Sequence, residues 1–287
     1  MCLRPLHYFQ SDIMNESTGK YYGFVTGYQT LVADYNDFKL RDIPCTLAHR
    51  ATPIKVACGR CCECLNAKKM SWVGRAVAEL ETSKYGYFLS ITYNNDHVLP
   101  KPEKREIQLF IKRLRKHFKL RYLTVGELGS LTDRAHYHMI LYSNQPINDL
   151  VYYSSSGSNI LYTSELIDSC WQKGSIKIGR AEASSIAYTV GYIVSKEKKT
   201  CFKLQSQGLG FDYFKNLNSS YVLSTGRGKE LYVRLPRYLK EKYGLKSEFD
   251  SVKAEREWKN KVFGSGLDEE DYRDFKQYLS EHKLIVH

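Results

Sequence analysis

The sequence predicts an α+β protein built on an antiparallel sheet with helices on its face. β-rich runs alternate with amphipathic segments in the order strand, helix, strand, strand, helix, strand, helix. The two central strands, 122–127 and 136–142, are close enough along the chain to pair as a hairpin. Hairpin-paired strands separated by helices are typical of sheets whose helices gather on one face. We expect an N-terminal segment with a cysteine cluster and a helix (1–84), a core (85–200) and a C-terminal helical extension (201–287).

The first elements lie in the N-terminal segment and at the start of the core. Residues 1–57 combine aromatic residues with short polar turns, so we expect irregular, strand-like structure. Apolar residues at helical spacing after Cys64 predict a helix. The run 87–93 is rich in β-forming residues and ends at the polar residues 94–96, which predicts a strand and a turn. Helical spacing returns in the apolar residues of 107–118 and predicts the next helix.

The second half of the core contains two further helices. Thr163 or Ser164 can cap a short helix that reaches Trp171, because both hydroxyls can accept a bond from a free backbone N–H. The strand 175–178 then leads into a helix over about 181–196.

Two segments are expected to differ from this pattern. The serine-rich stretch 154–158 is expected to be a mobile loop. Beyond residue 201 we expect glycine-rich turns and two helices.

The charge of the chain indicates a polyanionic partner. Lys and Arg number 43 against 31 Asp and Glu, giving a net charge of +12. The surplus is concentrated in 101–121, whereas 268–274 is acidic, which suits a nucleic-acid groove better than a diffuse basic coat. The residues expected to bind DNA are Lys104, Arg105, Lys112, Arg113, Arg115 and Lys116. The sequence shows neither a signal peptide nor an apolar run near the ~20 residues of a membrane span, so we expect a cytosolic protein that does not enter a membrane.

A histidine pair is the first motif with chemical potential. In a strand, side chains alternate faces, so His136 and His138 point the same way and Tyr137 points away. If the strands form a hairpin, Glu127 comes beside the histidines and completes a set of two imidazoles and one carboxylate that can bind a metal ion. The alternative is that both histidines are simply half-buried sheet residues.

A tyrosine pair follows on the last predicted helix of the core. Tyr188 and Tyr192 are four residues apart and therefore share one helix face, which Lys196 continues by a further turn. A phenol becomes a good nucleophile only when a metal or a cation draws off its proton, and Lys196 or a bound cation could do so. The alternative is core packing, because the chain has 23 tyrosines and chance pairs are common.

Cysteines cluster ahead of the first predicted helix. Cys58, Cys61 and Cys64 have the spacing of Zn²⁺ ligands, but a closed zinc site needs a fourth. Cys45, His49 or Cys62 could supply it, and the spacing does not choose among them. A tight turn with small, semi-buried thiols is an equal alternative, and a disulfide is the least favoured in a reducing cytosol.

Taken in order, these motifs resemble the HUH endonucleases, and more closely the replication initiators of gokushoviruses, small single-stranded DNA bacteriophages. The resemblance covers most of the chain. The segments that carry it are the strand Phe88-Leu89-Ser90-Ile91-Thr92-Tyr93, Cys58-Gly59-x-Cys61-x2-Cys64, Gly126-Glu127-x-Gly129 ahead of Arg134-Ala135-His136-Tyr137-His138, Tyr188-x3-Tyr192-x3-Lys196, Gly208-Leu209-Gly210 before Phe211, and Leu235-Pro236-Arg237-Tyr238. The chain departs from the family at Ala135, where a proline is frequent, and at Leu128, where an aromatic residue is usual; neither change removes a ligand.

The resemblance implies an HUH/RRM-like nuclease core that starts rolling-circle replication. It implies that Glu127, His136 and His138 hold Mg²⁺ or Mn²⁺ and that Tyr188 and Tyr192 are the nucleophiles. The expected substrate is single-stranded DNA at the viral origin, in the cytoplasm of a bacterial host. The sequence has no G-x4-G-K-[ST] phosphate loop, so unwinding and synthesis are expected from a host helicase and polymerase.

Two other functions are compatible with the same residues. A related HUH transposase or relaxase would share the metal site, although paired tyrosines and the cysteine segment argue against single-tyrosine transposases, and a relaxase would place its tyrosine nearer the N-terminus. A non-catalytic, zinc-dependent nucleic-acid binder would use the cysteines for structure and the tyrosines to stack on bases.

Overall fold

A computed structural model describes residues 2–27, 31–129, 133–157, 159–194, 201–215, 222–224 and 230–232. The chain divides into two compact units: the described residues up to Asn66 belong to the first and those from Ala67 onward to the second. The division into 1–84, 85–200 and 201–287 stays a prediction. None of the helices in the described part of the chain is long and apolar enough to span a membrane.

The first unit is a small β structure, in agreement with the expected strand-like character of 1–57. Its elements are β1 (Leu6–Asn15), β2 (Lys20–Thr26), β3 (Ala33–Asp34), α1 (Tyr35–Lys39), β4 (Arg50–Ala51) and β5 (Ile54–Val56). The strands β2, β1 and β5 form an antiparallel sheet in that order, and β3 pairs with β4. The helix α1 is an addition to the prediction; Asp34 caps it and forms a capping box with Asp37.

The second unit contains a seven-stranded antiparallel sheet in the order β12-β7-β8-β6-β11-β10-β9. Its strands are β6 (Tyr85–Thr92), β7 (Leu120–Leu128), β8 (Ala135–Ser143), β9 (Leu150–Ser156), β10 (Asn159–Ser164), β11 (Ile176–Arg180) and β12 (Phe202–Gln205). The predicted central hairpin is present as β7–β8, in a register that pairs Glu127 with His136 and Val125 with His138. The predicted α+β class is therefore confirmed.

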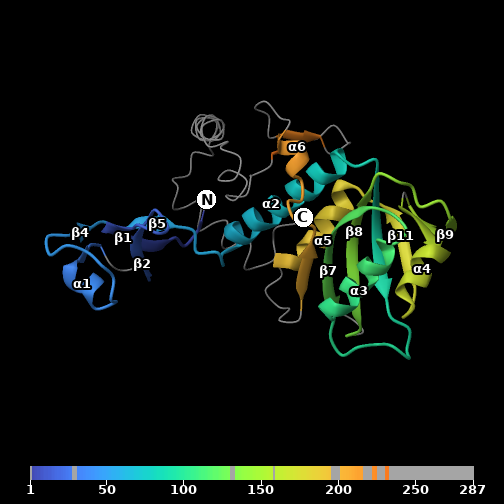
Figure 1. Cartoon of the computed structure of the whole chain (residues 1–287), viewed down its shortest axis with the longest axis horizontal. Helices are drawn as coiled ribbons and strands as arrows, with labels where there is room; N and C mark the ends of the chain where they lie inside the picture. The colour runs from blue at the N-terminus through green and yellow to red at the C-terminus, as the bar shows by residue number, and fades with distance from the viewer. Residues whose placement is uncertain are drawn as a thin grey trace. The chain divides into compact units, whose positions relative to one another are not determined.

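Helices cover both faces of this sheet, so the expectation that they gather on one face is wrong (Figure 1). The helices are α2 (Cys62–Glu81), α3 (Lys104–Leu114), α4 (Glu165–Trp171) and α5 (Ala183–Val194). Buried residues of α3 and α4 pack with Leu89 and Met139 on one face, the α3–α4 face. Buried residues of α2 and α5 pack with Ile140 and Tyr142 on the other, the α2–α5 face. The reason is that β8 is apolar on both faces, and each face must be covered.

The serine-rich stretch is also different from the prediction. Ser154 and Ser155 belong to β9 and pair with β10, so the expected loop is a hairpin whose turn contains Gly157 at a φ of 58°. Serine is tolerated here because β9 is the edge strand of the sheet and its serine side chains need not be buried. Ser158 lies outside the described residues.

The remaining elements bear on the C-terminal prediction. The structure describes α6 (Phe211–Lys215), β13 (Val222–Ser224) and β14 (Glu230–Tyr232). Ser164 caps α4, as predicted, by accepting a bond from the N–H of Ile167. Lys196, the segment 235–238 and the acidic segment 268–274 lie outside the described residues, as does most of the region expected to hold two helices.

Candidate active site

The β7–β8 hairpin brings Glu127, His136 and His138 together as the Glu–His–His group. Their ligand atoms all lie within 4.8 Å of one another. Glu127 Oε1 is 3.0 Å from His136 Nε2 and 3.3 Å from His138 Nε2. Glu127 and His138 are almost fully buried, with 2% and 5% of their surfaces exposed, whereas His136 is half-buried. The spacing expected from strand alternation is therefore present in three dimensions.

His136 has the orientation of a metal-binding imidazole. Its Nδ1 lies 3.1 Å from the carbonyl oxygen of Arg134, and its Nε2 faces Glu127. When Nδ1–H donates to that carbonyl, the lone pair of Nε2 is free for an ion, which is the usual arrangement of ligating histidines. Arg134 is itself fixed, because its guanidinium donates to the carbonyl oxygen of Tyr93 at 3.0 Å and to Oδ1 of Asn95 at 2.8 Å.

Tyr137, between the two histidines, belongs to the opposite face. It is fully buried, and its hydroxyl lies 2.8 Å from that of Tyr93. The same hydroxyl accepts a bond from the N–H of Glu103 at 2.9 Å. Gly126 is required beside Glu127 for a related reason: a Cβ there would lie 2.7 Å from the Phe202 ring.

Tyr188 and Tyr192 of α5 lie against this group on the α2–α5 face. The ring of His138 is 5.1 Å from that of Tyr188, edge to face, and 5.2 Å from that of Tyr192, stacked at 10°. The opposite side of α5 packs Ile186 and Val190 into the core. Tyr188 keeps 52% of its surface exposed. The tyrosine pair therefore contacts the histidines, which the simple core-packing interpretation does not require.

The site is acidic around Tyr192. Burial raises the pKa of Tyr192 well above its ordinary value; hydrogen bonds with Tyr188 and Glu127 and the negative charge of Glu127 raise it further. A cation in the Glu–His–His group would oppose the charge of Glu127.

The first unit holds a second group of ligand-type side chains, the cysteine quartet of Cys2, Cys58, Cys61 and Cys64. Their Sγ atoms all lie within 4.8 Å of one another. The fourth thiol is thus Cys2, and the expectation that Cys45, His49 or Cys62 completes the set is not met. Instead, His49 Nε2 lies 2.9 Å from the carbonyl oxygen of Gln10. The eight cysteines of the chain were the only signal for Cys2, because its partners lie far away in sequence.

The quartet is supported by backbone N–H groups that point at sulfur. Cys58 donates its N–H to Cys2 Sγ at 3.3 Å, and Arg60 and Cys61 donate to Cys58 Sγ at 3.4 and 3.3 Å. Gly59 makes this turn at a φ of +71°, a conformation that glycine adopts without strain. Although burial raises it, hydrogen bonds from backbone N–H groups and neighbouring thiols lower the pKa of Cys61 to about 6. The environment thus favours thiolate, the form that binds metal.

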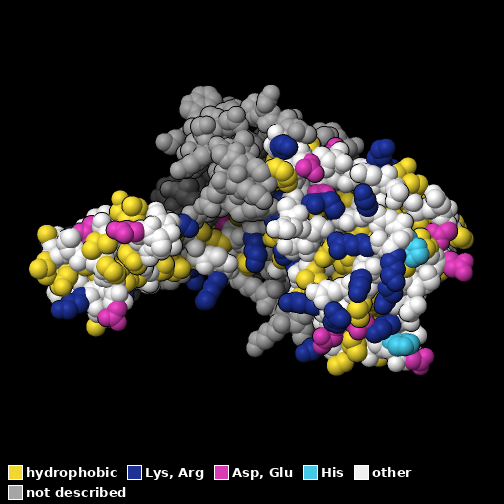
Figure 2. All heavy atoms as spheres, viewed as in Figure 1, with side chains coloured by type: hydrophobic (Ala, Val, Ile, Leu, Met, Phe, Trp, Pro, Cys, Tyr) yellow, Lys and Arg dark blue, Asp and Glu magenta, His cyan; other side chains and the backbone are white. Residues whose placement is uncertain are grey.

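The residues expected to bind DNA lie on or directly after α3, which covers the face opposite the Glu–His–His group. Figure 2 shows Lys and Arg side chains gathered over the region where α3 lies in Figure 1. Arg113 is partly engaged, since its guanidinium donates to the backbone carbonyls of Cys170 and Trp171. Lys104, Arg105, Lys112, Arg115 and Lys116 remain predicted DNA-binding residues, but the structure does not bring them to the tyrosines.

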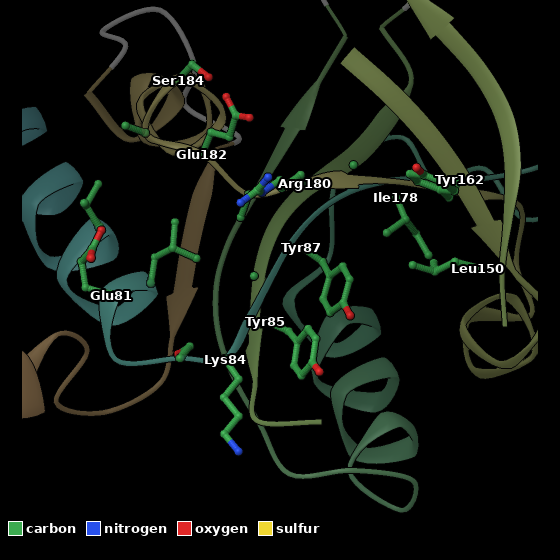
Figure 3. A pocket seen from close by; sticks show the side chains of 17 residues that line it. Glu81, Lys84, Tyr85, Tyr87, Leu150, Tyr162, Ile178, Arg180, Glu182 and Ser184 are labelled. Atoms are coloured by element: carbon green, nitrogen blue, oxygen red, sulfur yellow. The ribbon is translucent and has the colours of Figure 1, made fainter. Parts of the chain in front are cut away.

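A hollow of about 970 Å³ lies near the start of β6, with Tyr85, Tyr87, Arg180 and Glu182 around it (Figure 3). The Glu–His–His group is at the other end of that strand, where Ser90 and Thr92 pair with His138 and His136. None of the predicted site residues lines the hollow.

Comparisons with known proteins agree with the motifs. Residues 86–198, which include the Glu–His–His group and both tyrosines, match the family model of the replication-associated protein ORF2. The chain is 27% identical over 259 residues to the replication-associated protein ORF2 of Spiroplasma virus 4, an alignment that covers 80% of this chain and 77% of the relative.

Two further relatives are matched over about half of their own length. Identity is 28% over 216 residues with the replication-associated protein ORF4 of Chlamydia phage 1, covering 64% of this chain and 52% of the relative. It is 28% over 151 residues with the replication-associated protein VP4 of Bdellovibrio phage phiMH2K, covering 48% of each. No solved structure matches the chain. The resemblance to the replication initiators of gokushovirus-type phages, inferred from the sequence motifs, is thereby confirmed.

Proposed function

We propose that the chain is a rolling-circle replication initiator, acting as a metal-dependent, site-specific endonuclease and ligase of single-stranded DNA. The observation that carries this proposal is the juxtaposition of the Glu–His–His group with Tyr188 and Tyr192 on one sheet face. A ligand set for a cation beside paired phenols has the parts needed for transesterification at a phosphate.

The donor set fits a divalent cation. One carboxylate oxygen and two imidazole nitrogens converge, and the hydrogen bond between His136 Nδ1 and Arg134 leaves Nε2 directed at the same point. We propose Mg²⁺ or Mn²⁺ as the ion, with Mn²⁺ the better match to a mixed nitrogen and oxygen set. Bound there, it would polarise a phosphoryl oxygen and favour the ionised form of a nearby phenol.

Tyr188 and Tyr192 are the proposed nucleophiles. As Oη of one tyrosine forms a bond to phosphorus, the bond from phosphorus to O3′ breaks. The 5′ side of the cut stays on the tyrosine, and the phenolic proton is replaced, in net terms, by one on the released 3′-OH. The exposure of Tyr188 allows a strand to reach it without rearrangement of the core.

The second tyrosine gives the enzyme a way to finish the cycle. It can cut the regenerated origin while the first tyrosine still holds the 5′ end, and the new 3′-OH then attacks the first phosphotyrosine to close a circle. The proximity of the two rings, whose centroids lie 5.1 Å apart, supports action at one site.

For the cysteine quartet we propose Zn²⁺ in a structural role. Four thiols suit a closed tetrahedral site, and the N–H groups directed at sulfur stabilise thiolate. Four cysteine ligands leave no open position, so we expect the ion to stabilise the first unit and to take no part in cleavage.

The proposed setting is the cytoplasm of a bacterial host. The 3′-OH released by the cut would prime a host polymerase, and a host helicase would unwind the duplex, since the sequence carries no phosphate loop of its own.

The test is covalent trapping. The chain is incubated with a 5′- or 3′-labelled pool of random single-stranded oligonucleotides, with Mn²⁺ or with EDTA, and run on a denaturing gel. A metal-dependent adduct with the 3′-labelled strands, which carry the 5′ side of the cut, supports the enzyme. Binding with neither cleavage nor adduct would favour the zinc-dependent nucleic-acid binder instead.

A further inference from the structure

A group of cations around an indole ring lies on the same sheet face as the Glu–His–His group. This Trp72 cluster consists of Lys68, Trp72 and Arg75 of α2 and Lys203 of β12. Lys203 Nζ lies 3.2 Å from the centre of the Trp72 ring, and Arg75 Cζ lies 4.2 Å from it. Cation–π contacts of this kind hold charged groups in place.

The strand register shows how close this cluster is to the proposed catalytic residues. Lys203 pairs with Val125 on β7, and Val125 pairs with His138 on β8. Residues directly opposite in an antiparallel pair share a face, so the side chain of Lys203 projects on the same side as His138. Two strand spacings separate their backbones, which is about 10 Å.

The cluster has an excess of positive charge. Burial lowers the pKa of Lys203 to about 8, and the charges of Arg75 and Lys68 lower it further. Among the residues that the structure describes, no carboxylate forms a salt bridge with Lys68 or Lys203. Lys203 Nζ instead donates to the neutral Oε1 of Gln205 at 2.8 Å. An arrangement of crowded cations without a carboxylate counter-charge is suited to an anion.

The basic helix α3 cannot supply this charge at the tyrosines, because it covers the opposite face. A strand whose scissile phosphate lies at the Glu–His–His group needs its neighbouring phosphates held on the α2–α5 face.

We propose that Lys68 and Lys203, positioned by Trp72 and Arg75, bind a backbone phosphate of the single strand close to the one that is cut. This subsite rests on the proposed function, since it holds the DNA substrate of the same site. Arg75 is a positioning residue: it is buried, and its Nε donates to the carbonyl oxygen of Leu209 at 3.1 Å. Lys68 is exposed and Lys203 half-buried, so both can meet a phosphate.

The first experiment measures binding without cleavage. A random-sequence, fluorescein-labelled single strand is titrated in EDTA with Lys68→Gln/Lys203→Gln and with the control Lys20→Gln/Lys55→Gln, which removes the same charge from exposed positions of the first unit. We expect the first pair to weaken binding about tenfold and to reduce the salt slope by about 0.7 for each phosphate that is no longer neutralised. The control should stay close to wild type.

A second experiment separates this subsite from the activity itself. In Mn²⁺, Lys68→Gln/Lys203→Gln should raise the oligonucleotide concentration needed for half-maximal nicking and leave the rate at saturation unchanged. Lys203→Arg should restore binding, since arginine keeps the charge. If the wild type forms no adduct, the proposed function fails, and the binding experiment alone judges the subsite.

Two outcomes overturn the subsite. One is wild-type affinity and salt slope in Lys68→Gln/Lys203→Gln. The other is a weakening of binding no larger than in the control pair. Should substitution at Lys203 lower the Tm, Lys68→Gln alone, an exposed helix position, still decides: it must weaken binding, and unchanged affinity contradicts the proposal.

Discussion

Glu127, His136 and His138 come from the two strands of one hairpin, whereas the cysteine quartet joins Cys58 to Cys2, a partner 56 residues away. The first group keeps a half-exposed tyrosine against its histidines; the second consists of four thiols with backbone N–H groups directed at sulfur. A ligand set with three protein donors leaves positions for a substrate, while four thiolates close the coordination sphere. The difference indicates chemistry at one group and folding at the other.

The largest effect that this comparison predicts is at the histidines. His138→Ala should lower nicking by at least about a hundredfold, because a lost metal ligand costs no less than a lost supporting residue. Binding of single-stranded DNA in EDTA should stay within a few-fold of wild type. The matched control is His97→Ala, an exposed histidine outside the group. Full nicking by His136→Ala/His138→Ala in Mn²⁺ would exclude the metal assignment.

The next effect concerns the nucleophiles. Tyr188→Phe/Tyr192→Phe should form no covalent adduct, whereas each single variant should retain some cleavage and lose circle release. Phenylalanine keeps the ring packing, so the free energy of unfolding should fall by about 1 kcal/mol or less per hydrogen bond removed. Tyr152→Phe, an exposed tyrosine of β9, is the control. An adduct in the double variant would place the nucleophile elsewhere.

For the cysteine quartet the expected effect is on stability. The purified chain should contain one Zn²⁺, measured by metal analysis, and Cys2→Ser should release it and lower the Tm of the first unit. Cys62→Ser should keep both the metal and the Tm, because Cys62 is not one of the four thiols. Nicking should persist in Cys2→Ser. Zinc retained by Cys2→Ser but lost by Cys62→Ser would reverse the ligand assignment.

The smallest expected effect is a pH dependence at the Trp72 cluster. Lys203 is charged below a pKa of about 8 and neutral above it, with Lys68 and Arg75 as the charged groups that face it. Affinity for single-stranded DNA should therefore fall several-fold as the pH rises from about 7 to 9. Lys203→Arg should remove this change, because arginine stays charged throughout. An identical pH profile in both proteins would contradict it.

Local patterns predicted the part of the candidate site that depends on local geometry. Strand alternation set His136 and His138 on one face, and the short link between 122–127 and 136–142 predicted the hairpin that adds Glu127. Helical spacing likewise put Tyr188 and Tyr192 side by side. Each of these inferences needs only a period of 2 or 3.6 residues.

The features that the sequence did not predict depend on distant segments. The pairing of β12 with β7, which brings Lys203 to the site, joins parts of the chain with no shared local signal. Cys2 and the covering of both sheet faces are similar cases. The serine-rich β9 was missed because composition suggested a loop, while pairing with β10 decided the structure.

The buried hydroxyl of Tyr137 has a consequence for how the ligand strand folds. A slip of β8 by one residue would turn both imidazoles to the α3–α4 face and bring the phenol to the tyrosines. That slip would also remove the Tyr137 hydroxyl from the N–H of Glu103, directly before α3, and from the hydroxyl of Tyr93. The bulky residue between the histidines thus acts as an error check during folding: only the alignment that satisfies Tyr137 on one face produces a ligand set on the other.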